Sequence, residues 1–252
     1  MKKYIVAAAV IIALSIVAIA HADIYGSTLK AWWTLDSNDL NWTTGQVTDN
    51  SGNSITGQMR GLATTTSPFA GFVGQSLEFT GVSQYIDLGT PSSLNFNGSS
   101  NFSVSAWITN ASSSITTSAT IFSKGFSTNT QYQLYINSSN KIAFGQYSSG
   151  TNHEAVWGTA LTLNQWYFVV GTWNGSTWKI YVNNGPPVTN TTTSPPSTGQ
   201  KNCIGCIFIS GTASRFYQGN IDDLRVYNTA LTTNQIASIY QNGLGKHHGR
   251  PF

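Results

Sequence analysis

The sequence predicts an all-β fold in which two antiparallel sheets pack face to face. Only 8% of the 252 residues are charged, whereas an ordinary soluble domain carries about 25%. Aromatic residues make up 12% of the chain, including eight tryptophans. Short apolar segments alternate with Gly, Asn, Ser and Pro, which is typical of strands and turns. The aromatic content excludes a disordered chain, and the length suits one sandwich domain.

The first 22 residues are expected to be a signal peptide. Lys2 and Lys3 precede an almost unbroken apolar run, and Ala20-His21-Ala22 provides a small-x-small cleavage pattern before Asp23. The alternative is a retained anchor helix, but the run is at the lower limit for crossing a bilayer and no basic stop-transfer cluster follows it. We therefore expect a secreted, extracellular or cell-surface protein with no membrane span after cleavage. Losing the two lysines leaves a nearly neutral chain, which argues against nucleic acid as a partner.

The expected strands recur along the rest of the chain. Phe102–Ile108 alternates apolar and serine residues, which indicates one buried face. Trp166–Trp173 is apolar on both faces and therefore reads as a central strand, paired with Thr177–Val182 across the hairpin signal Asn174-Gly175. The other expected strands are Leu29–Leu35, Ser76–Phe79, Tyr85–Leu88, Thr120–Lys124, Tyr132–Asn137, Lys141–Tyr147, Ile204–Ile209 and Gly219–Tyr227.

One short helix, one long loop and a tail complete the expected domain, which spans residues 23–243. Leu231–Gly243 has a threonine cap, apolar residues at helical spacing and a final glycine. Pro186–Gln200 is rich in Thr, Pro and Ser and is expected to be a surface loop. Residues 244–252 are expected to form a flexible tail.

Cys203 and Cys206 are three residues apart in the sequence Cys-Ile-Gly-Cys. A zinc site would need a second pair of ligands, and no βαβ pattern supports a thioredoxin-like centre. In an exported protein the remaining interpretation is a structural disulfide that closes a turn.

Six segments, in order, resemble the laminin-G-like jelly roll of the concanavalin A-like lectin/glucanase superfamily, over about residues 29–241. The most specific segment is Gly219–Asn228 (GNIDDLRVYN). The others are Asp49–Asn53 (DNSGN), Ser76–Leu88 (SLEFTGVSQYIDL), Phe102–Ile108 (FSVSAWI), Ile121–Gly125 (IFSKG) and Trp166–Gly185, which begins with WYFVVGTW and ends with IYVNNG. The resemblance implies that the sandwich has jelly-roll topology.

An aspartate in the last strand breaks the expected alternation. Strict alternation places Asp222 on the core face with Leu224 and Val226, where an unpaired carboxylate is costly. Either a bulge at Asp222-Asp223 turns it outward or the carboxylate has a partner. The resemblance implies a structural calcium ion held by Asp49, Asn53, Asp222 and Asp223.

The sequence departs from the family pattern near this expected calcium site. Ser83-Gln84 replaces the usual acidic pair, and Thr80 stands where aspartate is usual. The alternative to a calcium site is therefore that the aspartates act as turn and hydrogen-bonding residues.

Catalysis is not expected. Glycosidases of this superfamily use paired carboxylates, but Glu78 and Glu154 are the only glutamates and neither belongs to a spaced acidic cluster. The chain also lacks a nucleophile elbow and a P-loop.

We therefore expect a binding module whose partners are glycans or surface glycoconjugates, because aromatic faces stack on sugar rings. The candidate ligand-binding residues are Trp42, Tyr135, Tyr147, Trp157 and Trp178. Each of them has the alternative of being a core aromatic. The second hypothesis is a structural or adhesion subunit that associates with itself through sheet edges, for example by adding Asp23–Thr28 to a neighbouring sheet.

Overall fold

The computed structural model describes residues 27–63, 68–98, 100–125, 129–192, 195 and 200–248. The expected signal peptide and most of the Asp23–Thr28 segment lie outside these residues. None of the helices in the described ranges has the length and apolar character needed to cross a bilayer.

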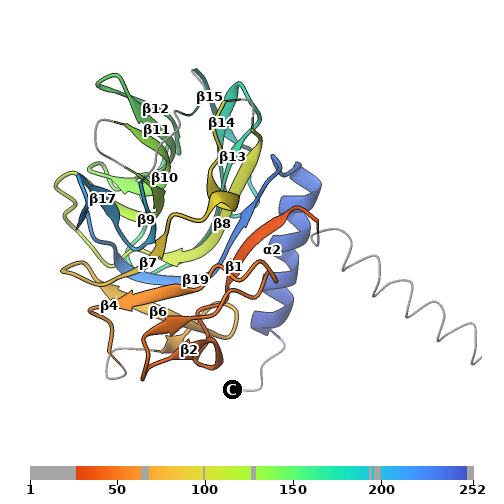
Figure 1. The fold of residues 1–252 in the computed structure, drawn as a ribbon. Coiled ribbons are helices and arrows are strands. Elements are labelled where there is room, and N and C mark those ends of the chain that lie inside the picture. Colours follow the sequence, from red (N-terminus) through yellow and green to blue (C-terminus); the bar gives the residue numbers. More distant parts are fainter. Residues whose placement is uncertain are drawn as a thin grey trace, which may run out of the picture.

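The described residues form two large antiparallel sheets, a small hairpin and one helix (Figure 1). Sheet A has the strand order β15-β14-β13-β8-β19-β6-β5, and β1 pairs with β19. Its strands are β1 (Leu29–Trp33), β5 (Phe69–Ala70), β6 (Gln75–Thr80), β8 (Phe102–Thr109), β13 (Trp166–Trp173), β14 (Thr177–Val182), β15 (Val188–Thr191) and β19 (Gln218–Tyr227).

Sheet B has the order β12-β11-β10-β9-β16-β7-β4-β3-β2. Its strands are β2 (Leu40–Asn41), β3 (Gln46–Val47), β4 (Gly57–Arg60), β7 (Tyr85–Gly89), β9 (Ser118–Lys124), β10 (Thr130–Asn137), β11 (Ile142–Ser148), β12 (Thr151–Val156) and β16 (Asn202–Ile204). The hairpin is β17 (Ile207–Ile209) with β18 (Thr212–Ser214), and the 3₁₀ turns are η1 (Ser37–Asp39) and η2 (Ser92–Leu94). The expected two-sheet sandwich is confirmed.

Three sequence expectations about the strands need correction. The expected loop Pro186–Gln200 contains β15, which pairs with β14. The expected strand Ile204–Ile209 is divided into β16 and β17, because Gly205 has a φ of 80° and turns the chain between them. The sequence around His153-Glu154 is strand-like, but it predicts no bounds for β12, because Thr-Asn-His-Glu-Ala-Val is mostly polar.

The main core fills the space between the two sheets, as the alternation of β8, β10 and β14 predicts. The sequence also predicts that Phe168 and Val170 face this core, and this is wrong, although both are buried. They point to the outer face of sheet A and pack in a second cluster with Trp107, Ile236 and other residues under the helix. Strand β13 is apolar on both faces because one face meets sheet B and the other meets the helix.

Gly171 allows the two sheets to approach closely at one point of the core. A Cβ atom at this position would lie 2.2 Å from Cγ of Phe144, a fully buried residue of β11 in the opposite sheet. Only glycine leaves room for the phenyl ring here. This position therefore fixes the distance between β13 and β11.

The C-terminal helix, α2, spans Thr233–His248, so it is longer than expected. Its start is a capping box, in which the Gln235 amide N–H donates to Oγ1 of Thr232 and the Thr232 amide N–H donates to Oε1 of Gln235. Gly243 does not end the helix. A Cβ there would lie 2.9 Å from Nε1 of Trp107, so this glycine lets the helix lie against sheet A. The expected flexible tail is therefore helical as far as His248, and residues 249–252 lie outside the described residues.

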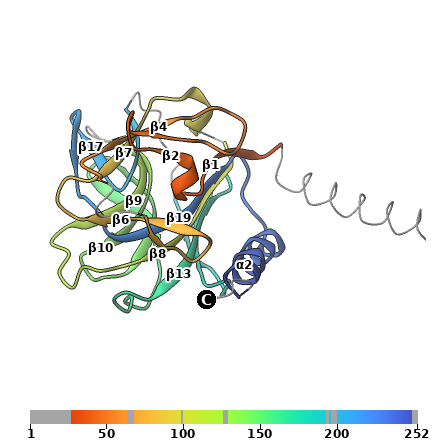
Figure 2. The same cartoon turned by 90° about the horizontal axis from the view of Figure 1, so that it is seen from below.

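Figures 1 and 2 both place α2 and β17 on opposite sides of the molecule. The helix covers the outer face of sheet A, whereas the hairpin β17–β18 flanks the outer face of sheet B. The two outer faces of the sandwich therefore have different surroundings.

Candidate functional site

A cavity of about 320 Å³ lies on the outer face of sheet B. Strands β10, β11 and β12 contribute Gln133, Tyr135, Tyr147 and Glu154 to its lining. The alternation of β10 explains this placement, because Leu134 and its inward neighbours are in the core while the residues between them face outward. Pairing of Gly145 with both Gln133 and Glu154 brings the three strands into register across the cavity.

A hydrogen-bonded pair occupies the floor of this cavity. The Tyr135 hydroxyl donates to Oε2 of Glu154. Burial raises the pKa of Glu154, although the hydrogen bond from Tyr135 acts in the opposite direction. Burial also raises the pKa of Tyr135, so its hydroxyl stays protonated and remains a donor at neutral pH. The carboxylate thus offers acceptor capacity at the base of a polar cavity.

Two further polar atoms of the cavity lining are buried and have no hydrogen-bond partner among the described residues. They are Oε1 of Gln133 and Oγ of Ser118, whose residues are 2% and 8% exposed. Burying such groups costs about 1–3 kcal/mol each, unless a ligand or water satisfies them. Both residues therefore add polar side chains to the lining of the cavity.

The hairpin β17–β18 and the residues after it build one wall of the cavity through Arg215. The Arg215 carbonyl accepts a hydrogen bond of 3.0 Å from the amide of Thr120 in β9. At the base of the hairpin, Cys203 and Cys206 form the expected disulfide, with a Cα–Cα distance of 5.6 Å. The disulfide is buried with Phe208, so it anchors the hairpin to the sheet.

The five aromatic residues expected to bind a ligand fall into three settings. Tyr135 and Tyr147 line the cavity. Trp42 and Trp157 are half-buried and pack against the main core. Trp178 has no exposed surface and lies beside Trp173, with ring centroids 4.4 Å apart. The expectation for Trp178 is corrected, because its position in β14 faces the inter-sheet core and leaves no ring face for a sugar.

Sequence reasoning did not assign Gln133, Arg215 or Glu154 to the site. Their convergence depends on strand register and on the return of the hairpin over β9, which no local motif encodes. The one usable signal was the scarcity of glutamate, because Glu154 is one of only two in the chain.

The residues expected to bind calcium do not converge on one point. Both oxygens of Asp49 accept hydrogen bonds, from the amides of Trp32, Ser51 and Ile55 at 2.9 Å each. Asn53 is exposed, and its amide group donates to the Leu29 carbonyl at 3.1 Å. These two residues stabilise the turn between β3 and β4 and hold it against β1.

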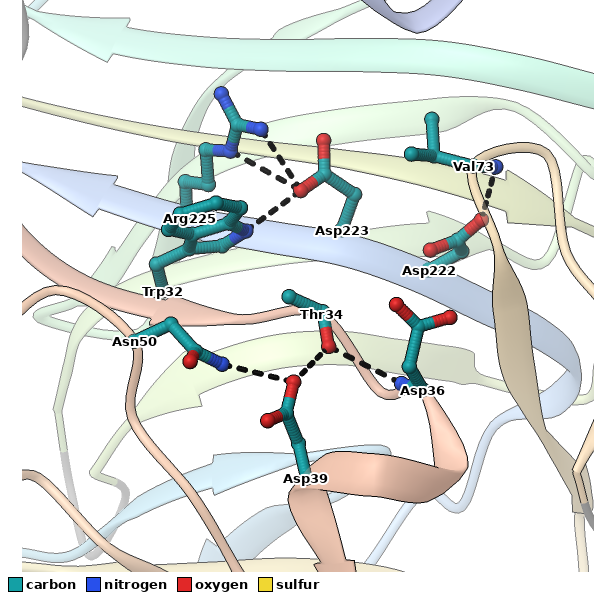
Figure 3. A network of polar contacts seen from close by, with 9 residues as sticks. All are labelled: Trp32, Thr34, Asp36, Asp39, Asn50, Val73, Asp222, Asp223 and Arg225. Atoms are coloured by element: carbon teal, nitrogen blue, oxygen red, sulfur yellow. Dashed lines mark hydrogen bonds and ion pairs between the residues drawn. The ribbon is translucent and has the colours of Figure 1, made fainter. Parts of the chain in front are cut away.

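A β-bulge separates Asp222 from Asp223 in β19, which is the first of the two alternatives that the sequence left open. Asp223 has a φ of 49° and turns toward Trp32 and Arg225, which donate to its Oδ1 at 2.6 and 2.9 Å. Asp222 points the other way and accepts from the Val73 amide at 2.7 Å (Figure 3). The two neighbouring carboxylates therefore serve different parts of the fold.

Asp222 keeps one buried oxygen, Oδ1, without a hydrogen-bond partner among the described residues. Burial raises the pKa of Asp222 well above its ordinary value, and the nearby charges of Asp223 and Asp36 raise it further. Figure 3 shows the Asp36 carboxylate beside that of Asp222. No group of three or more His, Cys, Asp or Glu side chains that could hold a metal occurs in the described ranges. A cation here would have two carboxylates and would need carbonyl or water oxygens as its other ligands.

A larger cavity of about 480 Å³ lies between α2 and sheet A, lined in part by Leu29, Trp32, Arg225 and Tyr227. Its arginine is already engaged, since Arg225 forms an ion pair with Asp223 and lies 4.6 Å from the centroid of the Trp32 ring. The cavity on sheet B differs because two of its lining residues, Gln133 and Ser118, carry buried polar atoms without a partner among the described residues. We therefore consider the sheet B cavity the better candidate for recognition of a polar ligand.

Solved structures with the same architecture include domain 4 of AbnA, a GH43 extracellular arabinanase from Geobacillus stearothermophilus, in complex with arabinotriose. It is 22% identical, with a TM-score of 0.67, over 85% of this chain and 98% of that one. The binding domain of Paraclostridial Mosquitocidal Protein 1 is 12% identical, also with a TM-score of 0.67, over 86% of this chain and 52% of that one. A Trypanosoma rangeli sialidase is 12% identical, with a TM-score of 0.60, over 85% of this chain and 32% of that one.

At these identities the structural likeness shows the fold alone. The chain corresponds to about half of the mosquitocidal binding domain and a third of the sialidase. A search of curated protein sequences gives no significant match. Residues 79–237 match the family described as the concanavalin A-like lectin/glucanases superfamily, over more than half of the sequence. Together with the two-sheet fold, this match shows that the chain belongs to the concanavalin A-like lectin/glucanase superfamily.

Proposed function

We propose that this protein is a secreted, non-catalytic module that binds neutral carbohydrate through the cavity on sheet B. The observation that carries the proposal is the set of buried acceptors in the cavity lining, on Gln133 and Ser118, beside the Tyr135–Glu154 pair. Sugar hydroxyls are both donors and acceptors and could satisfy all of these groups. The exposed part of the Tyr147 ring offers an apolar face at the same place.

The single carboxylate among the described residues of the cavity supports a binding role over catalysis. A glycosidase requires two carboxyl groups, about 5 Å apart in retaining enzymes and about 6.5–9.5 Å apart in inverting ones. Among the described residues that line the cavity, Glu154 is the only acid. Its hydrogen bond with Tyr135 further suits it to a fixed acceptor role.

The disulfide and the expected signal peptide support secretion. Disulfides persist in oxidising compartments and are rare in the cytosol. Expression of the full chain, followed by N-terminal sequencing of the exported product, tests this part of the proposal. A product beginning at Asp23 is the expected result, and a product that keeps residues 1–22 would contradict it.

The binding proposal is tested by calorimetry with a panel of neutral oligosaccharides that includes arabinotriose, the ligand present in the arabinanase domain structure. Glu154→Gln keeps the volume but removes the charge, so we expect about a tenfold loss of affinity for the sugar that binds best. Glu78→Gln is the matched control, because Glu78 lies in β6 of the other sheet. Equal affinity of the two variants, or no binding to any panel member, would rule the proposal out.

We further propose that Asp222 and Asp36 hold a structural calcium ion, in place of the four-residue set expected from the sequence. The unsatisfied Oδ1 of Asp222 and the adjacent Asp36 carboxylate support this assignment. Bound calcium would neutralise two neighbouring negative charges and join the segment between β1 and η1 to β19.

Thermal unfolding in calcium and in chelator tests this site. Calcium at about 100 times its dissociation constant stabilises the native state by about 2.7 kcal/mol, so the melting temperature should rise. Asp222→Asn should abolish this rise, whereas Asp87→Asn, which removes a surface ion pair with Lys201, should preserve it. A wild-type melting temperature that does not respond to calcium would exclude the site.

A further inference from the structure

A second cavity, of about 330 Å³, adjoins the candidate carbohydrate site. The two cavities share three lining residues, Thr117, Ser118 and Arg215. Each volume alone is at the small end of the range for ligand pockets, which is about 300–1,000 Å³. The shared residues make the cavities neighbouring sections of one surface depression between the loop before β9 and the hairpin β17–β18.

Ser118 lies at the junction of the two cavities. It is the first residue of β9 and is 8% exposed, and its buried Oγ has no hydrogen-bond partner in the described part of the chain. A ligand that passes from one cavity to the other would cross this residue. The junction is therefore formed by a polar residue, and not by an apolar barrier between two separate pockets.

The second cavity has the composition of a neutral sugar subsite. Its lining includes the loop residues Ser114 and Thr116, together with Gln218 and Phe216. No acidic residue occurs among its described lining residues, and Arg215 is the only charged one. The lining thus offers hydroxyl and amide groups with little net charge.

The wall shared by both cavities is held rigidly. Arg215 has a φ of 52° and is fixed by the hydrogen bond from Thr120, while Phe216 lies against Tyr85 with ring centroids 6.0 Å apart. The disulfide at the base of the hairpin restrains the same segment. A preformed wall reduces the entropy lost when an extended ligand is held along it.

We infer that the two cavities are successive subsites of one groove, which binds a neutral polysaccharide chain laid across Ser118. This inference rests on the proposed function, because it extends the carbohydrate site on sheet B. It adds that the ligand is a chain long enough to occupy both cavities, and not a single terminal sugar.

Calorimetry with linear arabino-, xylo- and cello-oligosaccharides, from dimer to octamer, tests the inference. In the series that binds, affinity should rise with chain length until both cavities are filled and then level off. Thr116→Arg places a long side chain in the second cavity at an exposed position, so folding should be preserved. It should weaken binding of the long oligomers about tenfold and leave the shortest bound oligomer unaffected. Thr189→Arg, at an exposed position in β15 of the other sheet, is the matched control.

The possible results separate the two levels of the proposal. If short oligomers bind with sensitivity to Glu154→Gln, but longer ones bind no more tightly, the single groove is refuted and the sugar site stands. Equal losses for short and long oligomers in Thr116→Arg would also refute it. If no oligomer of any length binds, or if Glu154→Gln has no effect, the proposed function itself fails.

Discussion

Replacing Gly171 by alanine should destabilise the protein, even though alanine is the better residue for a strand interior. Glycine loses more backbone freedom on folding than alanine does. This difference alone would stabilise the alanine variant by about 0.5–1 kcal/mol. Against this, the new Cβ would lie 2.2–2.5 Å from three atoms of the Phe144 ring. The ring cannot simply rotate away, because Phe102 and Trp178 pack around it with centroids 5.9 and 5.4 Å distant.

Overpacking of this kind costs about 1–3 kcal/mol, so we expect a net loss of about 1–2 kcal/mol. For a domain of this size the melting temperature should fall by about 2–8 °C. Urea unfolding gives the free energy, and an unchanged m-value would show that the denatured state is not involved. The strand that carries Phe144 also carries Tyr147, so a weaker affinity for sugar should accompany the loss of stability.

A second substitution isolates the cause. Phe144→Leu costs stability on its own, but in the Gly171→Ala background it makes room for the new methyl group. The double variant should therefore lose at least 0.5 kcal/mol less than the sum of the two single variants, which is about the smallest coupling expected for residues in contact. Strictly additive effects, or a stabilised Gly171→Ala protein, would show that the sheets are not held at the spacing described.

Three further predictions concern the site and its supports. Burial raises the pKa of Glu154, so the folded state binds its proton more tightly than the unfolded state does. The free energy of unfolding of the wild type, relative to that of Glu154→Gln, should therefore fall as pH rises above about 4.5. Urea unfolding between pH 4 and 8 measures this difference, and a difference that rises with pH would refute the prediction. Replacing Cys203 and Cys206 by serine should lower the free energy of unfolding by only about 2 kcal/mol, because the loop that the disulfide closes is short. Calorimetry should also show weaker sugar binding, and unchanged affinity would mean that the hairpin does not shape the groove. Trp178→Ala should lower the free energy of unfolding by about 3–5 kcal/mol, because Trp178 is in the core. Tyr147→Ala should reduce sugar affinity with little effect on unfolding. A Tyr147→Ala protein that is strongly destabilised, or a Trp178→Ala protein that is not, would contradict the placement of these residues.

The strands that could be predicted from the sequence are those buried on one or both faces. Phe102–Ile108 and Trp166–Trp173 contain the alternation or the continuous apolar run that burial requires, and β13 has the predicted bounds. Strand β15 was not predicted and β12 was predicted without bounds, because both lie at sheet edges and carry polar side chains, so hydrophobic periodicity is absent from them. Pairing with a neighbouring strand, and not burial, makes these segments extended.

The candidate site was only partly predictable for a related reason. The aromatic residues at 135 and 147 were identified by type, since rings suit sugar binding. Whether such a ring lines the cavity or lies in the core depends on which face of its strand it occupies. Trp178 lies on the face of β14 that points into the core. The contributions of Gln133 and Arg215 arise only after distant segments are aligned. Sequence patterns report local burial well, but they do not report the convergence of polar groups across strands.

One consequence for how the module is displayed follows from where the described residues begin and end relative to the proposed groove. Leu29, near the start of the described chain, and Lys246, near its end, line the same cavity beneath α2. Both lie on the helix side, and the hairpin that walls the groove lies on the other side (Figures 1 and 2). A carrier or support joined at either end would therefore approach the face that the helix already covers. The groove would point away from the attachment, toward whatever surface the module meets.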